Sequence, residues 1–152
     1  MSAKSIFALA AVCLTTIIVA SAFIGLFVYD NFLPHPIQLQ IIDQTNPDPN
    51  KPNIVASGLT VQDERTIPYS LHVSGRLNNT GGGIAYNASL HVVATNKEGT
   101  AIDRFYSFGG ITGHMTLGLD FRFEYSGPPI DSCTITAIYT DRMPPSSNDT
   151  SG

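Results

Sequence analysis

SLHVSGRLNNTGGGIAYNASLHVVAT, residues 70–95, is the stretch that decides the fold class. In its first part Leu71 and Val73 alternate with polar residues, and in its last part Leu90 and Val92 do the same. A period of two places one set of side chains on the buried side of a strand and the other set in water. The glycines between the two parts interrupt the pattern and supply backbone freedom for positive φ where one strand leads to the next. We therefore expect two strands here, each with one buried face.

Apolar runs continue at similar intervals through the rest of the outer part, separated by Gly, Pro and Asn, and no sustained helical period occurs after residue 30. This spacing is typical of an all-β sandwich. We expect a seven-stranded immunoglobulin-like sandwich over residues 37–141, with Val73, Leu90, Leu119 and Phe121 pointing inward and a long loop at Gln44–Asn53. The expected strands are Ile37–Asp43, Ile54–Gln62, Ser70–Asn78, Ala85–Thr95, Thr100–Phe108, Thr116–Tyr125 and Cys133–Thr140.

Ser70–Asp103 resembles the FxLyD-type and related CARDB-like immunoglobulin-like domains. In those domains a strand with V-x-G-x-L-x-N runs into N-x-G, and a second strand and a Gly-containing turn follow. Gly109–Phe123 is similar to the next segment of the pattern, whereas Ala94-Thr95-Asn96 departs from it, because the family has an aromatic residue followed by Asp there. The resemblance implies a β-sandwich of surface and exported proteins in which strands 70–78 and 85–95 belong to opposite sheets.

An uncharged apolar run of about 25 residues, Ser5–Tyr29, precedes this domain. As a helix it would span roughly 37 Å, enough for a hydrocarbon core of about 30 Å. Lys4 lies before the run, while the other side begins with Asp30 and has no cation until Lys51. The positive-inside rule then predicts a cytoplasmic end (residues 1–4), a transmembrane signal-anchor helix (5–29) in the cell membrane, and an extracytoplasmic domain.

A cleaved secretory signal is the alternative, because Ala20-Ser21-Ala22 is a small-x-small sequence that a signal peptidase could cut after Ala22. Against cleavage, the apolar run continues from Phe23 to Val28. Residues 30–36 contain two prolines and predict an extended stalk, and residues 142–152 have the composition of a disordered tail.

The anchor also has small residues at spacings that favour close helix approach in a membrane. Self-association through the anchor is therefore an alternative to a plain anchoring role. The candidate packing residues are Ala11, Thr15, Ser21, Ala22 and Gly25.

The sequence lacks the groupings that carry enzymatic chemistry. No Ser or Cys stands in a nucleophile elbow, and Cys133 alternates with apolar residues as a small core residue does. With 8 Lys and Arg against 12 Asp and Glu, the chain has a net charge of -4 and no basic stripe for nucleic acid. We expect a protein that is not an enzyme, binds no nucleic acid and needs no cofactor.

Two sets of residues are weak candidates for a metal site. His72 and His91 would face each other if their strands formed a simple hairpin, but they would point apart if the strands lie in opposite sheets. Asp43 and Asp48 offer oxygen ligands in the first long loop, where turn-forming Asp and Asn residues explain the same composition. We expect no metal at either place.

Three N-x-S/T triplets make Asn78, Asn87 and Asn148 candidates for glycosylation, as suits an exported domain. Taken together, these features predict a non-enzymatic single-pass membrane protein that presents a β-sandwich for contact with other proteins, as an accessory subunit of a membrane complex. The alternatives are a pilin-like surface-filament subunit and a secreted or metal-binding exported domain.

Overall fold

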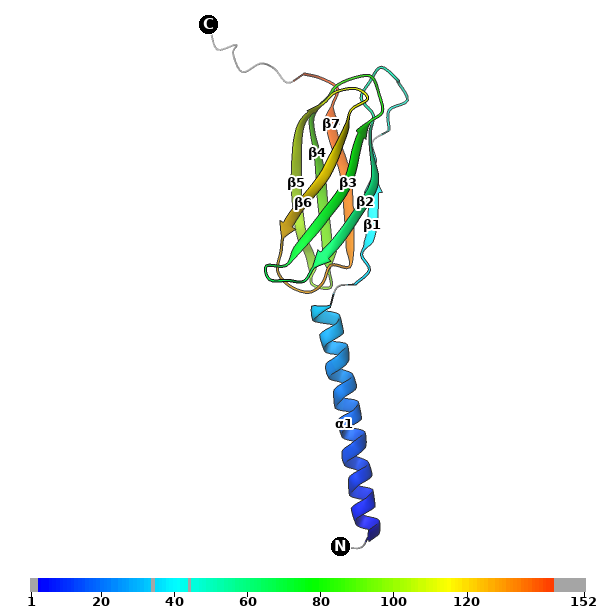
Figure 1. Ribbon diagram of the computed structural model, residues 1–152, viewed down its shortest axis with the longest axis vertical. Helices are drawn as coiled ribbons and strands as arrows, with labels where there is room; N and C mark the ends of the chain where they lie inside the picture. The colour runs from blue at the N-terminus through cyan, green and yellow to red at the C-terminus, as the bar shows by residue number, and fades with distance from the viewer. Residues whose placement is uncertain (1–2, 34, 44, 144–152) are drawn as a thin grey trace. The chain divides into compact units, whose positions relative to one another are not determined.

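The computed structural model describes residues 3–33, 35–43 and 45–143. The chain divides into two compact units, Met1–Leu33 and Pro34–Gly152. The first unit is the helix α1 (Ala3–Phe32), and the second contains all the strands (Figure 1).

Helix α1 includes one segment, Ala10–Phe32, that is long and apolar enough to cross a membrane, with a mean hydropathy of 2.5. A signal sequence near an N-terminus can also be long and apolar enough to meet this criterion. The helix is longer than the expected 5–29 because it continues to Phe32, and the expected stalk is correspondingly shorter. Pro34 disfavours the helical conformation at Leu33, the residue before it, and so the helix continues past the expected end at Tyr29 and ends at Phe32.

All seven expected strands are present. Their ends lie within two residues of the expected ones, except that β5 reaches Ile111 instead of Phe108. The strands are β1 (Gln38–Ile42), β2 (Ile54–Glu64), β3 (Ser70–Asn79), β4 (Ala85–Asn96), β5 (Gly99–Ile111), β6 (Thr116–Glu124) and β7 (Ser132–Thr140).

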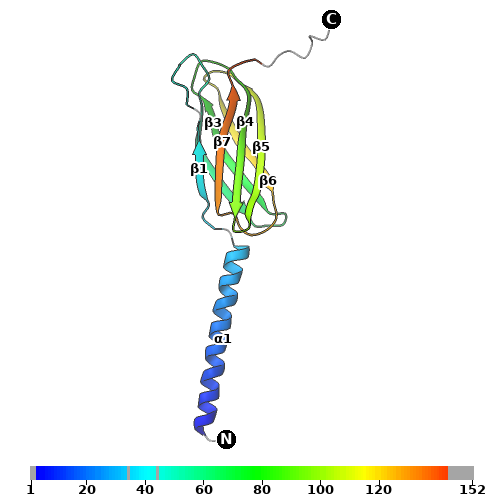
Figure 2. The same cartoon turned by 180° about the vertical axis from the view of Figure 1, so that it is seen from behind.

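The strands form two sheets that pack as a sandwich. A three-stranded sheet has the order β2-β3-β6 and lies in front in Figure 1. A four-stranded sheet has the order β1-β7-β4-β5 and lies in front in Figure 2. Strand β1 pairs with β7 in parallel, and all other pairs are antiparallel. This is the all-β sandwich after one helix that the alternation predicts.

The alternating residues meet between the sheets. Val73, Leu90, Leu119 and Phe121 are all buried, as predicted. In β4 every second residue from Ala88 to Ala94 is buried, and in β7 Cys133 and Ile135 are buried opposite them. Burying a large aliphatic side chain stabilises the fold by about 1.5–3 kcal/mol, so this interior holds the two sheets together.

Strands β3 and β4 follow one another in the chain but belong to different sheets. His72 of β3 and His91 of β4 therefore lie on opposite outer surfaces of the sandwich. The hairpin that would have brought the two rings together does not form, because the Gly81–Gly83 segment carries the chain across from one sheet to the other.

The glycine run acts differently from the expectation. None of Gly81–Gly83 has a positive φ. These residues instead allow close approach of another loop, since a Cβ on Gly81 would lie 1.9 Å from the carbonyl oxygen of Lys51. The run is therefore needed for backbone packing against the Asp48–Asn53 loop, not for left-handed conformation.

Candidate functional site

The two outward surfaces of the sandwich differ in charge. We call the outward side of β2, β3 and β6 the charged face. Its ionisable residues, which alternate with buried ones along the three strands, are Glu64, His72, Arg76, Asp120, Arg122 and Glu124.

His72 lies at the centre of an ion network on the charged face. Its Nε2 lies 2.7 Å from Oδ1 of Asp120, and its Nδ1 lies 3.4 Å from Oε1 of Glu64. Arg122 Nε donates to Oε2 of Glu64 at 3.1 Å. The Arg122 hydrogen bond lowers the pKa of Glu64, and the same bond raises the pKa of Arg122. These side chains neutralise one another within the face.

We call the outward side of the four-stranded sheet the neutral face. Its side chains are mostly hydroxyls, amides and aliphatic groups. In the regular parts of the four strands they are Gln38, Gln40 and Ile42 of β1; Ser132, Thr134, Thr136 and Ile138 of β7; Ser89, His91, Val93 and Thr95 of β4; and Asp103, Phe105 and Ser107 of β5.

His91 and Asp103 are the two residues with acidic or basic side chains among those just named on the neutral face. His91 Nε2 lies 2.7 Å from Oδ1 of Asp103, so these two groups satisfy each other. The His91 ring also stacks on Phe105, with ring centroids 4.3 Å apart and planes 6° from parallel. Phe105 is nevertheless 61% exposed. The neutral face thus presents a large aromatic ring to solvent in surroundings of low charge.

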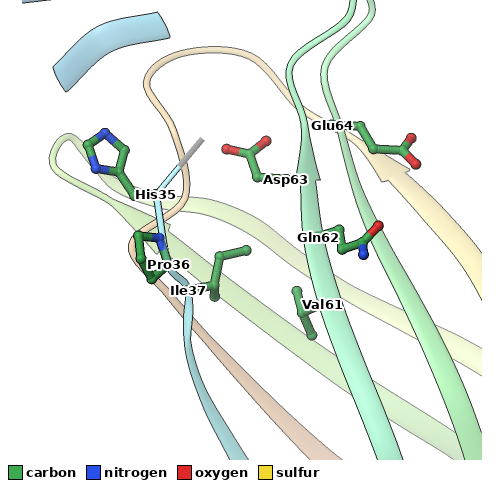
Figure 3. Close-up of a pocket in the computed structure, with 7 residues that line it drawn as sticks. All are labelled: His35, Pro36, Ile37, Val61, Gln62, Asp63 and Glu64. Carbon is green, nitrogen blue, oxygen red and sulfur yellow. The ribbon is translucent and has the colours of Figure 1, made fainter. Parts of the chain in front are cut away.

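A groove of about 370 Å³ lies between the start of the second unit and β2 (Figure 3). His35, Pro36 and Ile37 line one side, and residues Val61–Glu64 of β2 line the other. In Figure 3, Asp63 extends toward the His35 side, whereas Glu64 points away from it. The volume is at the lower end of the range for small-molecule sites.

The carboxylate of Asp63 is already bonded within the protein. Its Oδ1 accepts a hydrogen bond from the Tyr125 hydroxyl, and its Oδ2 accepts one from the Ile130 backbone N–H at 3.1 Å. Arg65 donates to the Tyr125 hydroxyl at 2.9 Å and lies over the Tyr69 ring at 3.7 Å. Burial raises the pKa of Tyr125 well above its ordinary value. This cluster ties β2 to the end of β6, which is a structural task.

The loop carboxylates that were weak metal candidates serve as hydrogen-bond acceptors. Asp43 Oδ1 accepts the Ala56 backbone N–H at 3.1 Å, and Asp48 Oδ1 accepts the Asn50 N–H at 2.9 Å. Within residues 3–33, 35–43 and 45–143, no group of three or more His, Cys, Asp and Glu side chains has an arrangement suited to a metal ion.

Cys133 is fully buried, and burial raises the pKa of its thiol to about 11. At neutral pH it is a protonated core side chain without access to a substrate. Its position between Leu39 and Ala94 in the register agrees with the alternation that marked it as a core residue.

The three glycosylation candidates lie in different surroundings. Asn78 donates to Ser57 and accepts from Thr116, both at 2.8 Å, so its amide joins all three strands of its sheet. Asn87 is exposed, has a φ of 50° and lies at an irregularity in the pairing of β4. Asn148 lies outside the described residues.

The small residues of α1 are exposed along the helix. The Thr15 hydroxyl donates to the Ala11 carbonyl at 3.0 Å, and the Ser21 hydroxyl donates to the Ile17 carbonyl at 2.5 Å. Both hydroxyls are thus satisfied within the helix. Ala22 and Gly25 are open to a neighbour of any kind.

Two important residues were not singled out from the sequence. Asn79 is 1% exposed, donates to the Gly83, Ile111 and Thr112 carbonyls, and accepts from two backbone N–H groups. Its place beside the glycine run was the available signal. Phe105 lies on the outward side of β5, whereas its neighbours Arg104 and Tyr106 lie on the other side of the strand. The alternation of side chains along a strand could have shown this from the sequence.

No protein-family model matches the chain, and neither the curated proteins nor the solved structures include a significant match. The arguments on function below therefore rest on the residues themselves.

Proposed function

We propose that this chain is a non-enzymatic, single-pass membrane protein that presents its β-sandwich outside the cytoplasm for contact with another protein, as an accessory subunit of a membrane complex. The observation that carries the proposal is the neutral face, where Phe105 and Ile138 are exposed and a single Asp–His pair is ionisable. Protein interfaces are depleted of charge in their centre and enriched in aromatic side chains.

The contrast with the opposite face supports the choice of surface. On the charged face six ionisable side chains lie on three strands and would have to be stripped of water when a partner binds. On the neutral face the hydroxyls of Thr134 and Thr136 can exchange water for partner groups at low cost. A partner protein therefore binds the four-stranded sheet more readily than the three-stranded one.

The anchor and its flanks support the location. A helix such as Ala10–Phe32 holds the β domain at a membrane. Lys4 precedes it, and no Lys or Arg follows it until Lys51, so the positive-inside rule directs the β domain across the membrane. The non-enzymatic part rests on the candidate groups described above, since the Cys133 thiol is buried and protonated and the Asp63 carboxylate is bonded within the fold.

The test is retention of a partner by the full chain after extraction in mild detergent. Thr136→Lys places a charge in the middle of the neutral face, and Ser74→Lys places one at a comparable half-buried position on β3, on the charged face. We expect a stoichiometric second protein to be retained by the wild type and by Ser74→Lys, and to be lost with Thr136→Lys. Equal retention by both variants, or no retained protein with any of the three, would contradict the proposal.

Orientation is tested separately with Asn87→Cys, an exposed position, in a Cys13→Ser background. A membrane-impermeant maleimide added to intact cells should label this chain. If labelling requires lysis, the β domain is cytoplasmic and the proposed location is wrong.

A further inference from the structure

The two sheets have four edge strands, and three of them are interrupted or charged. Strand β1 has five residues and follows Pro36, and β2 has a register shift between Ser57 and Thr60. Strand β6 carries Asp120, Arg122 and Glu124 on its outward side. Short strands, bulges and charges are the means by which natural edges avoid pairing with other chains.

Strand β5 also carries two charged residues, Asp103 and Arg104, but it differs from the other edges in its length and in the regular stretch at its centre. It has 13 residues, the longest of the seven strands, and among the described strands it pairs with β4 alone. Its pairing with β4 is regular from Ile102 to Ser107, and the register shifts lie on either side of this stretch. This regular stretch of the edge leaves a row of backbone N–H and C=O groups open to a further strand.

We propose that this edge binds a second copy of the same chain, with the two β5 strands antiparallel and Phe105 opposite Phe105 of the other copy. The inference goes beyond the proposed function, because it concerns the edge of the four-stranded sheet and a partner identical to the chain itself. It needs no contact with the centre of the neutral face.

The choice of a second copy follows from the sequence of β5, which is complementary to itself about Phe105. In a continuous antiparallel sheet with a two-fold axis perpendicular to it, residues equally far from the axis lie opposite each other on the same face. Centring on Phe105 places Arg104 opposite Tyr106, and Ile102 opposite Phe108. Arg–aromatic and apolar pairs of this kind are favourable.

The two registers with earlier centres are less suitable. A centre at Arg104 places two guanidinium groups opposite each other, and a centre at Asp103 does the same with two carboxylates. Like charges directly opposite are destabilising. With the centre at Phe105, each Asp103 instead faces Ser107, whose hydroxyl can donate to it. Charge thus favours this register over those with the centre one or two residues earlier.

The pairing joins the two four-stranded sheets into one eight-stranded sheet with a continuous neutral face. Phe105, which is 61% exposed in the single chain, would lie beside its counterpart on the outward side of the joined sheet. Because β1 runs parallel to β7, and β5 is antiparallel to β4 as β7 is, β1 and β5 start at the same end of the sandwich. In the pair, the two β1 strands therefore start at opposite ends of the joined sheet.

The test uses the full chain in detergent and charge substitutions at Ser107, which is exposed and outward. Ser107→Asp places two Asp–Asp pairs across the contact, and Ser107→Lys places two Lys–Asp pairs there. We expect Ser107→Asp to weaken dimerisation, measured by sedimentation equilibrium, on the order of tenfold, and Ser107→Lys to strengthen it by a similar factor. Gln62→Asp and Gln62→Lys, exposed changes on the other sheet, serve as matched controls and should leave the dissociation constant within about twofold.

The register has its own measurement. In a Cys13→Ser background, Phe105→Cys should form an interchain disulfide with itself, since paired Cα atoms across an antiparallel sheet lie about 4.5–5.5 Å apart. Gln62→Cys should form none. A chain that is monomeric at all concentrations, or a dimer that responds equally to Ser107→Asp and Ser107→Lys, would overturn the pairing. A monomer that still retains a different protein through Thr136 would overturn this inference and leave the proposed function standing, and a dimer that retains none would do the reverse.

Discussion

His72 and His91 make the same contact on opposite faces of the sandwich, each with Nε2 2.7 Å from an Asp Oδ1. Around His72 the charged face adds Glu64 and Arg122, whereas around His91 the neutral face adds the exposed ring of Phe105. Both sheets bury the same kind of alternating apolar residues. The difference teaches that the inward residues determine the fold, while the outward residues distinguish the charged face from the neutral face, which we propose as the binding surface.

The largest expected effect comes from the interior that both faces share. Phe121 is 6% exposed, stacks on Tyr106 at 4.2 Å and meets Phe123 edge-on. Phe121→Ala should destabilise the domain by about 3–5 kcal/mol, because it leaves a cavity between the sheets. Chemical denaturation of the full chain in detergent measures this. A loss below about 1 kcal/mol would mean that inward and outward sides are wrongly assigned in β6.

The second effect lies at the end of the sandwich where the two sheets are joined. Asn79→Ala removes three donated and two accepted hydrogen bonds and leaves buried backbone groups without partners. We expect a loss of about 2–3 kcal/mol in the free energy of unfolding. Asn78→Ala is the matched control, since it alters only the charged-face sheet and should cost about 1 kcal/mol or less. Equal losses of stability in the two variants would show that Asn79 contributes no more to the fold than Asn78 on the charged face does.

The third effect is pH-dependent. The pKa of Tyr125 is raised in the folded state, mainly by burial, and so its contribution to stability is complete below its ordinary pKa of 10.0 and is lost as the pH rises above it. Between pH 10 and 11, stability should fall by up to about 1 kcal/mol more in the wild type than in Tyr125→Phe, because half of the unfolded tyrosines are already ionised at pH 10. Urea titrations at the two pH values measure the difference. An equal fall in stability between the two pH values in the wild type and in Tyr125→Phe would show that Tyr125 is accessible to water in the folded state.

The smallest effect belongs to the charged face itself. Arg122→Met should raise the pKa of Glu64 toward its ordinary value of 4.5, because the Arg122 hydrogen bond is the main cause of its lowering. The lowered pKa stabilises the fold above pH 4.5, and this contribution is lost as the pH falls. NMR titration of the Glu64 carboxyl measures the change. Partner retention should be unaffected, and its loss would show that the charged face takes part in binding.

Much of the fold could be predicted from the sequence, because burial on one side imposes a period of two. The alternation around Val73, Leu90 and Phe121 predicted both the strands and their inward sides. The assignment of His72 and His91 to opposite sheets came from the family resemblance, since local pattern alone allowed a hairpin.

The remainder depends on long-range contacts that no local pattern contains. The role of Gly81 depends on the Lys51 carbonyl, and the bonds of Asn79 reach Ile111 and Thr112. The candidate surface required the strand order as well, because β1, β7, β4 and β5 are scattered along the chain and form one face only once they are paired.

The most direct test of the central claim is site-specific photo-cross-linking in native membranes. A photoreactive amino acid is placed either at Val93, outward on the neutral face, or at Gln62, outward on the charged face. The account predicts a cross-linked product with a protein other than this chain from position 93, and none above background from position 62. Products of equal yield from both positions, or from position 62 alone, would contradict the claim that the neutral face is the binding surface.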